Sequence, residues 1–279
     1  MSRDDVWRVM PLSVDDVARQ LALSEAIVEA VGSGGAPPTA RVYVMDDPTV
    51  VLGVGQRAGD VDLDAIRASD WRLARRLSGG TAVYHDRQSI SVERIVPTGH
   101  MLAPGSVHDA MERFARIVAA MVGALGAESR LLTIAEARAS RVEPGLEPVC
   151  FAAPAPFEVV DPGGRKLAGL AQVRRRAVVL HHAALYVTFD AERSARMIRS
   201  ARDEAERARL RAALNAVIGD LMHACGRVVG PQDVEAALAS TLEGAGWPQV
   251  ASGPEPHETE RAGELAELKY RNDARTFRR

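Results

Sequence analysis

Short strand-forming segments fill most of the first 190 residues, and tight turns join them more often than helices do. Arg41–Met45 and Thr49–Gly53 are dense in β-branched residues, and Asp46–Pro48 supplies the turn between them. Beyond residue 190 the apolar spacing is helical, in about four pieces. Hairpin-linked strands followed by helices predict an α+β fold, in which a mixed, largely antiparallel sheet packs on helices. Residues 190–279 are expected to form its helical C-terminal part.

Two helices of the strand-rich part have clear start signals. Ser13 is placed to cap a helix that carries Asp15 and Asp16 in its first turn, where the helix dipole favours acids. That helix is expected to end before the glycines that begin at Gly32. From Ser106 onward apolar residues recur at helical spacing, so a second helix is predicted there.

A hairpin and a loop are predicted in the middle of the chain. Phe157–Val160 and Lys166–Gly169 flank the segment Asp161–Gly164, whose sequence Asp-Pro-Gly-Gly is typical of a tight turn. Residues 136–149 contain two prolines and a glycine, and we expect them to form an exposed loop.

Composition narrows the functional classes. A net charge of −2 gives no indication of a nucleic-acid or anionic-membrane partner, and no apolar run approaches the length that spans a bilayer. Met1–Asp5 holds no apolar signal region, so we expect a cytoplasmic protein. Cys150 and Cys225 are far apart, which argues against a disulfide framework. We expect residues 1–279 to form a single domain.

Lysine is rare in this chain. Only Lys166 and Lys269 are lysine among 35 basic residues, and a lysine, unlike an arginine, can lose its proton when its pKa is lowered. Cys150 precedes Lys166 by sixteen residues, and a positive charge near a thiol favours the nucleophilic thiolate. The pair is a candidate for acyl transfer. The alternative is that Cys150 only fills the core and that Lys166 has no chemical role.

Gly79 and Gly80 follow a predicted strand and lead into another β-rich segment. The glycine turns of dinucleotide-binding and P-loop proteins open a helix, so these two glycines predict neither. A turn that lets the backbone approach a ligand closely fits better.

Five segments carry the motifs of one known family in the same order. They are Gly53–Gln56, Arg75–Asp86, Gly164–Gln172, Val179–Leu185 and Leu268–Asp273. Together they resemble the lipoate-protein ligase A and octanoyltransferase family, whose longer motifs read RRxSGGGAVxHD and GRKxxGSAQ. The resemblance covers nearly the whole chain and implies a biotin/lipoate-ligase-like fold, which agrees with the strand pattern.

The resemblance implies one of two chemistries. Octanoyltransferases of this family take an acyl group from acyl carrier protein onto a cysteine, without a cofactor. They then pass it to a lysine of a lipoyl-domain protein, such as glycine cleavage H protein or the E2 subunit of a 2-oxoacid dehydrogenase. ATP-dependent ligases activate free lipoate with ATP and Mg²⁺ and usually carry an accessory domain.

The cysteine segment favours the transferase. Pro148–Phe151 resembles the nucleophile segment of one bacterial transferase branch, and its spacing to Lys166 fits that branch. A chain of 279 residues leaves little room for an accessory domain. We therefore expect an acyltransferase that moves octanoyl or lipoyl groups, with an ATP-dependent ligase or an inactive acyl- or lipoyl-domain-binding relative as the alternatives.

The same resemblance implies the site residues. Cys150 would be the nucleophile, and Lys166 would hold the acyl carbonyl and stabilise the developing oxyanion. The expected substrate-binding residues are Arg76, Ser78, Gly79, Gly80, His85, Gly169, Ala171 and His182. No metal ligand is expected. For His85 the alternative is a buried histidine that pins its loop, and for Arg75 it is a solvated or ion-paired side chain.

Three residues depart from the family pattern inside these motifs. Thr81 replaces a third glycine, Leu170 replaces a small residue, and Ala183 replaces a glycine. We expect all three to lie near the acyl site, with Thr81 in a loop where its side chain disfavours positive φ and Leu170 adding bulk. The closing tryptophan of the family is also absent after Asp273.

Overall fold

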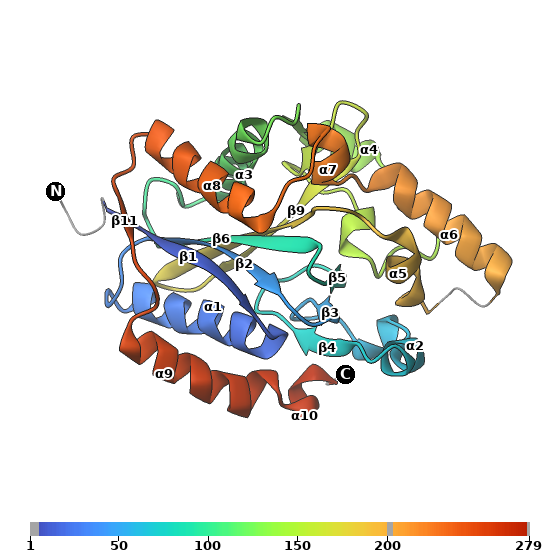
Figure 1. The fold of residues 1–279 in the computed structure, drawn as a ribbon, viewed down its shortest axis with the longest axis horizontal. Helices are drawn as coiled ribbons and strands as arrows, with labels where there is room; N and C mark the ends of the chain where they lie inside the picture. The colour runs from blue at the N-terminus through green and yellow to red at the C-terminus, as the bar shows by residue number, and fades with distance from the viewer. Residues whose placement is uncertain (1–5, 200–202, 278–279) are drawn as a thin grey trace.

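The computed structural model describes residues 6–199 and 203–277, and their strands form two sheets (Figure 1). The larger sheet has the order β11-β1-β2-β6-β10-β9-β8-β7. Its strands are β1 (Trp7–Asp15), β2 (Thr39–Met45), β6 (Ser89–Pro97), β7 (Arg130–Leu131), β8 (Val159–Val160), β9 (Lys166–Arg174), β10 (Val178–Tyr186) and β11 (Gln249–Ala251). The smaller sheet has the order β4-β3-β5 and consists of β3 (Thr49–Leu52), β4 (Arg72–Arg75) and β5 (Val83–His85).

Antiparallel pairing dominates the larger sheet. From β2 through β6, β10, β9 and β8 to β7 every neighbouring pair is antiparallel, whereas β1 pairs in parallel with both β2 and β11. The predicted α+β fold with a largely antiparallel sheet is therefore confirmed. The turn at Asp46–Pro48 joins β2 to β3, and because these strands belong to different sheets it carries the chain from one sheet to the other.

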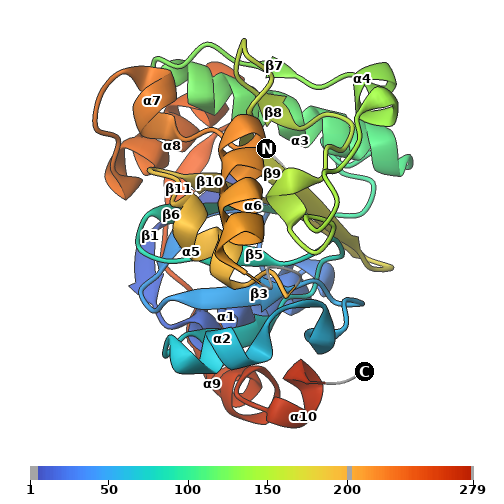
Figure 2. The same ribbon diagram turned by 90° about the vertical axis from the view of Figure 1, so that its right-hand side faces the viewer.

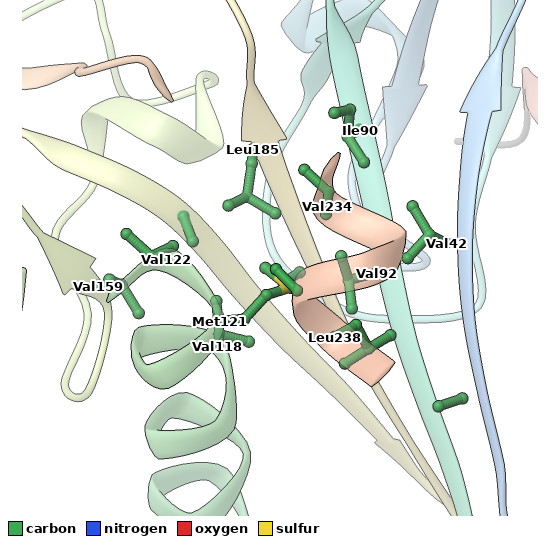
Figure 3. Close-up of a cluster of buried hydrophobic side chains, with 14 of the residues drawn as sticks. Val42, Ile90, Val92, Val118, Met121, Val122, Val159, Leu185, Val234 and Leu238 are labelled. Atoms are coloured by element: carbon green, nitrogen blue, oxygen red, sulfur yellow. The ribbon is translucent and has the colours of Figure 1, made fainter. Parts of the chain in front are cut away.

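Helices cover both faces of the larger sheet (Figure 1). On one face α1 (Val17–Gly32) lies against β2, β6 and β10, and α9 (Pro256–Leu265) packs on the outside of α1. On the other face lie α3 (Val107–Ala124) and α8 (Pro231–Gly244), which also contact each other. Figure 3 shows the apolar core on this second face, where side chains of α3 and α8 meet those of the strands.

The smaller sheet has a core of its own, which adjoins α5 (Ala191–Arg196) and α6 (Glu204–Val217) (Figure 2). The 3₁₀ turn Cys150–Ala152 contributes Phe151 and Ala152 to this core. The remaining elements are α2 (Leu63–Ala68), α4 (Ile134–Ala139), α7 (Leu221–Cys225), α10 (Asp273–Thr276), the 3₁₀ turn Ala58–Asp60 and a π-helical turn at Ala266–Tyr270. The Cys150 segment thus lies between the smaller sheet and the helices that cover it.

The predicted start of α1 is wrong by three residues. Ser13 belongs to β1, which continues to Asp15 because its pairing with β2 resumes after a register shift between Met10 and Ser13. Asp16 is the N-cap instead, and its side chain accepts a hydrogen bond from the Arg19 amide. The strand pairing outweighs the local capping preference of serine.

Two further element predictions need correction. Residues 136–149 are not wholly a loop, because α4 extends to Ala139 and is started by the reciprocal hydrogen bonds of Thr133 and Glu136. The C-terminal part is not purely helical, because β11 adds an edge strand parallel to β1. The other predicted helix starts and the hairpin around Asp161–Gly164 are confirmed.

No helix in residues 6–199 and 203–277 is both long and apolar enough to cross a membrane. The segment Met1–Asp5 lies outside the residues that the structure describes. The cytoplasmic location stays a prediction.

A buried ion pair fastens α9 to β1 and provides a test of the fold. Arg8 Nη1 and Nη2 donate to the two carboxylate oxygens of Glu258 at 2.6 and 2.7 Å, and Arg8 is only 2% exposed. Glu258→Gln leaves this guanidinium buried without a counter-charge, so we expect the free energy of unfolding to fall by about 3 kcal/mol in urea denaturation. Glu260→Gln, on the exposed side of the same helix, should change it by less than about 0.5 kcal/mol. Equal effects of the two variants would contradict this account.

Candidate functional site

Cys150 opens the 3₁₀ turn Cys150–Ala152 and is held against the smaller sheet by main-chain hydrogen bonds. Its amide donates to the Ala82 carbonyl at 2.8 Å, and the Ala82 amide donates to the Pro148 carbonyl at 2.9 Å. Cys150 is partly buried. The segment that carries the thiol is therefore fixed on one side by the strand that follows the Gly79–Gly80 turn.

Bare glycine backbone faces the Cys150 sulfur. Gly80 has a φ of +87°, and a Cβ built on it would lie 3.5 Å from Cys150 Sγ and 3.0 Å from Arg76 Nη2. A side chain at this position would meet both groups and would force the backbone into a conformation that only glycine adopts readily. The turn thus places the Cys150 sulfur and the Arg76 guanidinium next to the main chain of Gly80.

Arg76 holds the glycine turn in shape. Its guanidinium donates to the Gly79 carbonyl at 2.7 Å, to the Thr81 carbonyl at 2.9 Å and to Ser78 Oγ at 2.9 Å. Burial lowers the pKa of Arg76, and its interaction with Cys150 acts in the opposite direction. Arg76, Ser78, Gly79 and Gly80 are therefore brought together with Cys150 as the sequence predicted.

A β-bulge turns Lys166 toward the Cys150 segment. Val159 pairs with Ala168 but Val160 pairs with Lys166, so two residues of β9 oppose one of β8. Such a bulge re-aims the side chains beyond it. Lys166 is 4% exposed, and its Nζ donates to the Cys150 carbonyl at 2.9 Å and to the Ala153 carbonyl at 3.3 Å. The predicted pairing of Cys150 with Lys166 in space is present, although the lysine contacts the main chain of the cysteine turn.

Glu158 is a residue of this site that sequence reasoning missed. Its Oε1 lies 2.5 Å from Lys166 Nζ, and both side chains are buried. Burial raises the pKa of Glu158, and the charge of Lys166 opposes that rise. The signal that could have revealed it is a lone acid between the apolar residues Phe157 and Val159, just before the strand that pairs with the start of β9, because buried acids need a partner.

Gly169 gives the cysteine turn the space that it needs. A Cβ on Gly169 would lie 3.0 Å from the Phe151 ring and 3.3 Å from Lys166 Cε. Phe151 follows Cys150 directly, and Lys166 Nζ lies 5.1 Å from the centre of its ring. The glycine in β9 therefore lets Phe151 settle onto the sheet beside the lysine.

The two predicted histidines lie on the same side of the site, but neither touches the sulfur through a recorded hydrogen bond. His182 pairs across the strands with Ala171, and its Nδ1 lies 3.5 Å from Ser78 Oγ, at the limit of a hydrogen bond. His85 Nδ1 lies 3.0 Å from Ser89 Oγ within its own loop. This contact supports the interpretation that His85 pins the loop. Burial lowers the pKa of both rings to about 3, with Arg76 contributing, so both are neutral near pH 7.

The expectation that Leu170 and Ala183 crowd the acyl site is wrong. These two residues are direct cross-strand neighbours in β9 and β10, and both belong to the apolar core under α3. Because side chains alternate along a strand, they point away from the face that carries Gly169 and His182. Leu170 therefore fills core space opposite Ala183.

Thr81 also departs from its expectation. The residue with positive φ in this turn is Gly80, and Thr81 is not among the non-glycine residues with positive φ, which in the described chain are Asp70 and Phe157. The Thr81 carbonyl accepts a hydrogen bond from Arg76, and its side chain is partly exposed. The substitution of glycine by threonine thus costs the turn no backbone strain.

The alternative of a solvated Arg75 is wrong, because this side chain is buried and binds main-chain carbonyls. It is 1% exposed, and it donates to the Gly53 and Gln56 carbonyls at 2.8 and 2.5 Å. It also donates to the Arg275 and Thr276 carbonyls of α10 at 3.2 and 2.7 Å. A Cβ on Gly53 would lie 1.9 Å from the Gly80 carbonyl oxygen. Arg75 therefore ties the C-terminal helix to the turn that supports Gly80.

Among the residues that the structure describes, no group of three or more His, Cys, Asp or Glu side chains is placed to hold a metal ion. Cys225 lies in α7 and packs on the core under α3 and α8. Cys150 is therefore the cysteine that lies beside Lys166 and the glycine turn.

Comparison with known proteins places these features in a family. The description "Lipoyl protein ligase A/B catalytic domain" matches residues 16–243. Octanoyltransferase LipM of Kyrpidia tusciae is 31% identical over 274 residues, which cover 98% of this chain and 99% of that protein. Octanoyltransferase LipM of Moorella thermoacetica is 34% identical over 189 residues, or 67% of each protein.

Solved structures show the same fold. A bi-partite lipoate protein ligase from Thermoplasma acidophilum has a TM-score of 0.79 at 23% identity, and 98% of each chain is covered. A lipoate-protein ligase A bound with ATP has a TM-score of 0.76 at 21% identity, again covering 98% of each chain. The predicted lipoate-ligase-like fold is confirmed by these likenesses. With the match over residues 16–243, they show that the chain belongs to the lipoyl protein ligase A/B family.

Proposed function

We propose that this protein transfers an octanoyl or lipoyl group from acyl carrier protein, through a thioester on Cys150, to a lysine of a lipoyl-domain protein. The observation that carries the proposal is the position of Cys150 Sγ beside Gly80 and Arg76, in a turn held by Lys166. Its relatives over the whole chain are octanoyltransferases. Glycine cleavage H protein and the E2 subunit of 2-oxoacid dehydrogenases are the proposed acceptors.

The proposed reaction consists of two nucleophilic displacements at the acyl carbonyl carbon. First, the Cys150 sulfur attacks the donor thioester; the new carbon–sulfur bond forms as the donor's breaks, and the thiol proton passes to the released donor thiol. Then the acceptor lysine amine attacks the Cys150 thioester; a carbon–nitrogen bond forms, the carbon–sulfur bond breaks, and an amine proton returns to Cys150. A thioester replaces a thioester and is then replaced by a more stable amide, so neither step needs ATP.

Three residues around Cys150 each contribute differently to the reaction at its sulfur. Gly80 exposes backbone beside the sulfur, so an acyl group can approach without meeting a side chain. Arg76 places a positive charge next to the sulfur, which in general favours a nucleophilic thiolate. Lys166 fixes the carbonyl of Cys150 itself, so it orients the turn that carries the sulfur. Its three donors bind the Cys150 and Ala153 carbonyls and Glu158, so its proposed stabilisation of a developing oxyanion requires one of these contacts to be released.

Other expectations from the sequence stay predictions. They are the single domain over residues 1–279, the absence of nucleic-acid and membrane partners, and catalysis without ATP or Mg²⁺. An ATP-dependent ligase would need the nucleotide and would tolerate the loss of Cys150. An inactive relative would bind an acyl group or a lipoyl domain without turnover.

The thioester intermediate is testable by mass. Incubation with octanoyl-acyl carrier protein and no ATP should add one octanoyl group to the intact protein, and an apo lipoyl domain should then remove it and gain the same mass. Cys150→Ser should lower the transfer rate at least about 1000-fold, because the nucleophile is lost. Cys225→Ser, which changes the other cysteine, should leave the rate unchanged. Full transfer by Cys150→Ser would refute the proposal.

If Lys166 positions the cysteine turn, an arginine at this position should not preserve activity, although it carries the same charge. Lys166→Arg keeps the charge beside Glu158 but cannot place a planar guanidinium between Phe151 and Gly169 without moving the cysteine turn. We expect the rate of Cys150 acylation to fall about 100-fold, measured by quenched-flow mass spectrometry. Lys269→Arg, at a lysine paired with Glu25, serves as the matched control. A normal acylation rate in Lys166→Arg, with thermal unfolding unchanged, would show that Lys166 has no positioning role.

The buried neutral histidines predict how stability depends on pH. The pKa of His182 is about 3 in the folded protein and about 6.5 in an unfolded chain, so between these values the unfolded chain binds a proton that the folded one does not. The stabilisation is complete above about pH 6.5 and is lost as the pH falls toward 3. His182→Gln should reduce the loss of unfolding free energy between about pH 7 and about pH 4 by roughly 2 kcal/mol, while exposed His257→Gln should not. The free energy of unfolding is measured by urea denaturation at each pH. If it falls by the same amount in His182→Gln and in the unmodified protein, the assignment is contradicted.

A further inference from the structure

A polar groove leads away from the cysteine turn over the surface of the protein. Its inner part has a volume of about 740 Å³ and is lined by Gln56, Thr81 and Pro148, among others. A second hollow of about 590 Å³ adjoins it and reaches Arg57 and Phe277. The two share Gly59, Asp60 and Arg199 in their lining, so they adjoin each other, and we call them together the groove.

The inner end of the groove borders the nucleophile. Pro148 precedes Cys150 by two residues, and its carbonyl accepts hydrogen bonds from the Ala82 amide and from Gln56 Nε2. Thr81 follows Gly80, whose backbone faces the Cys150 sulfur. The groove therefore begins at residues next in the chain to the glycine turn and close to Cys150, although neither Gly80 nor Cys150 itself lines it.

The groove wall suits a chain of amides better than a hydrocarbon. Gly59, Gly145 and Pro148 contribute main chain rather than large apolar side chains to the lining. The Thr81 hydroxyl makes no hydrogen bond with the described part of the chain, so it is available to a ligand. Gln56 places its side-chain amide on the same wall. Amide groups can exchange hydrogen bonds with such a surface, whereas an acyl chain would leave it unsatisfied.

Two arginines stand at the outer part of the groove without a carboxylate partner. Arg57 and Arg199 are exposed, and neither forms an ion pair within residues 6–199 and 203–277. Within residues 6–199 and 203–277, Arg199 Nη1 donates to the Gly59 carbonyl at 3.0 Å. By contrast Arg193 and Arg196, on the preceding helix, are paired with acids.

The acidic residues of the groove do not neutralise these arginines directly. The Asp60 carboxylate accepts from the Arg57 amide, and the Glu147 carboxylate accepts from the Gly145 amide. Both acids therefore serve to close local turns. Two guanidiniums with free donors on one groove form a binding place for a phosphate group.

We propose that this groove holds the polar arm of the acyl donor: a chain of amides that carries the acyl thioester at one end and a phosphate at the other. The thioester lies at Cys150, the amides lie along Thr81 and Gln56, and the phosphate lies between Arg57 and Arg199. A phosphopantetheine thioester has this chemistry. The inference rests on the proposed function, because it assumes that the donor is a thioester that acylates Cys150.

The charge of the groove separates the donor from the acceptor. The acceptor brings a lysine side chain, whose ammonium would be repelled by Arg57 and Arg199. A phosphate on the donor arm is attracted by the same pair. Asp60 and Glu147 also line the groove, so this preference is confined to the outer part where Arg57 and Arg199 lie.

The test compares three octanoyl thioesters of increasing length: octanoyl-N-acetylcysteamine, octanoyl-pantetheine and octanoyl-phosphopantetheine. The second-order rate constant of Cys150 acylation is followed by intact mass for each. In the unmodified protein the phosphorylated donor should react at least about tenfold faster than octanoyl-pantetheine, as two charge-assisted contacts would give. In the double variant Arg57→Ala/Arg199→Ala this ratio should fall to about 1. Because the readout is a ratio within one variant, a general loss of folded protein cancels.

The control variant and the outcomes keep the two proposals apart. Arg113→Ala/Arg116→Ala removes two exposed arginines of α3, on the far face of the larger sheet, and should preserve the tenfold ratio. If the short thioester acylates Cys150 but the phosphate gives no advantage, or the advantage survives in Arg57→Ala/Arg199→Ala, the groove assignment is overturned and the proposed function stands. If octanoyl-acyl carrier protein acylates Cys150 but none of the three small donors does, the groove assignment is overturned and the proposed function stands. If octanoyl-acyl carrier protein also fails to acylate Cys150, the proposed function fails and the groove assignment fails with it.

Discussion

The Lys166–Glu158 ion pair is the contact on which the geometry of the site depends. Lys166 reaches the Cys150 and Ala153 carbonyls from β9, and Glu158, the residue before β8, holds it in place. On the other side, the Cys150 amide is bound to the Ala82 carbonyl next to the smaller sheet. The cysteine turn is therefore fixed between two sheets, and neither sheet alone determines where the sulfur lies.

A buried ion pair of this kind is a poor source of stability, because removing two charges from water costs about as much as their attraction returns. Its value here lies in position. A lysine whose ammonium already binds two carbonyls of one turn gives that turn a single conformation. The bulge in β9 belongs to the same arrangement, since it brings Lys166 onto the side of the sheet where the cysteine turn lies.

Two neighbouring arginines extend this framework through main-chain carbonyls. Arg76 closes the glycine turn from within, and Arg75 connects the turn at Gly53 to the last helix. A guanidinium suits both tasks, because its donors radiate in a plane and stay protonated when buried. The last helix thus bears on the site through Arg75 and the close contact of Gly53 with the Gly80 carbonyl.

The features that could be predicted from the sequence are those that depend on local signals. The strands, the hairpin at Asp161–Gly164 and the glycine turn follow from β-branched runs and turn residues, which act over a few positions. The start of α1 was missed because the pairing of β1 with β2 extends past Ser13, and pairing between distant strands leaves no local mark. Glu158 was missed for the same reason, since its partner is defined by the hairpin register.

Leu170 was expected near the acyl site because it replaces a small residue of the family motif, and the bulge in β9 decides the face on which it lies. Strict alternation puts Lys166 and Leu170 on one face of β9, which would set the leucine beside the lysine. The bulge after Lys166 adds one residue and reverses that parity, so Leu170 faces the core under α3 while Gly169 faces Phe151. A single unpaired residue thus decides which side chains share the site with Cys150, and no periodicity in the sequence reveals it.

The three departures from the family motifs have one explanation: each occurs where the backbone and the packing accept the new side chain. Leu170 and Ala183 are cross-strand neighbours on the face away from the sulfur, and Thr81 follows the residue that needs positive φ. A side chain at position 80 or 169 would reach the cysteine turn, and this chain has glycine at both positions. The sequence has therefore varied where the structure leaves room and kept glycine where the backbone must approach the sulfur or the Phe151 ring. This pattern is expected of a turn that still has to admit an acyl group.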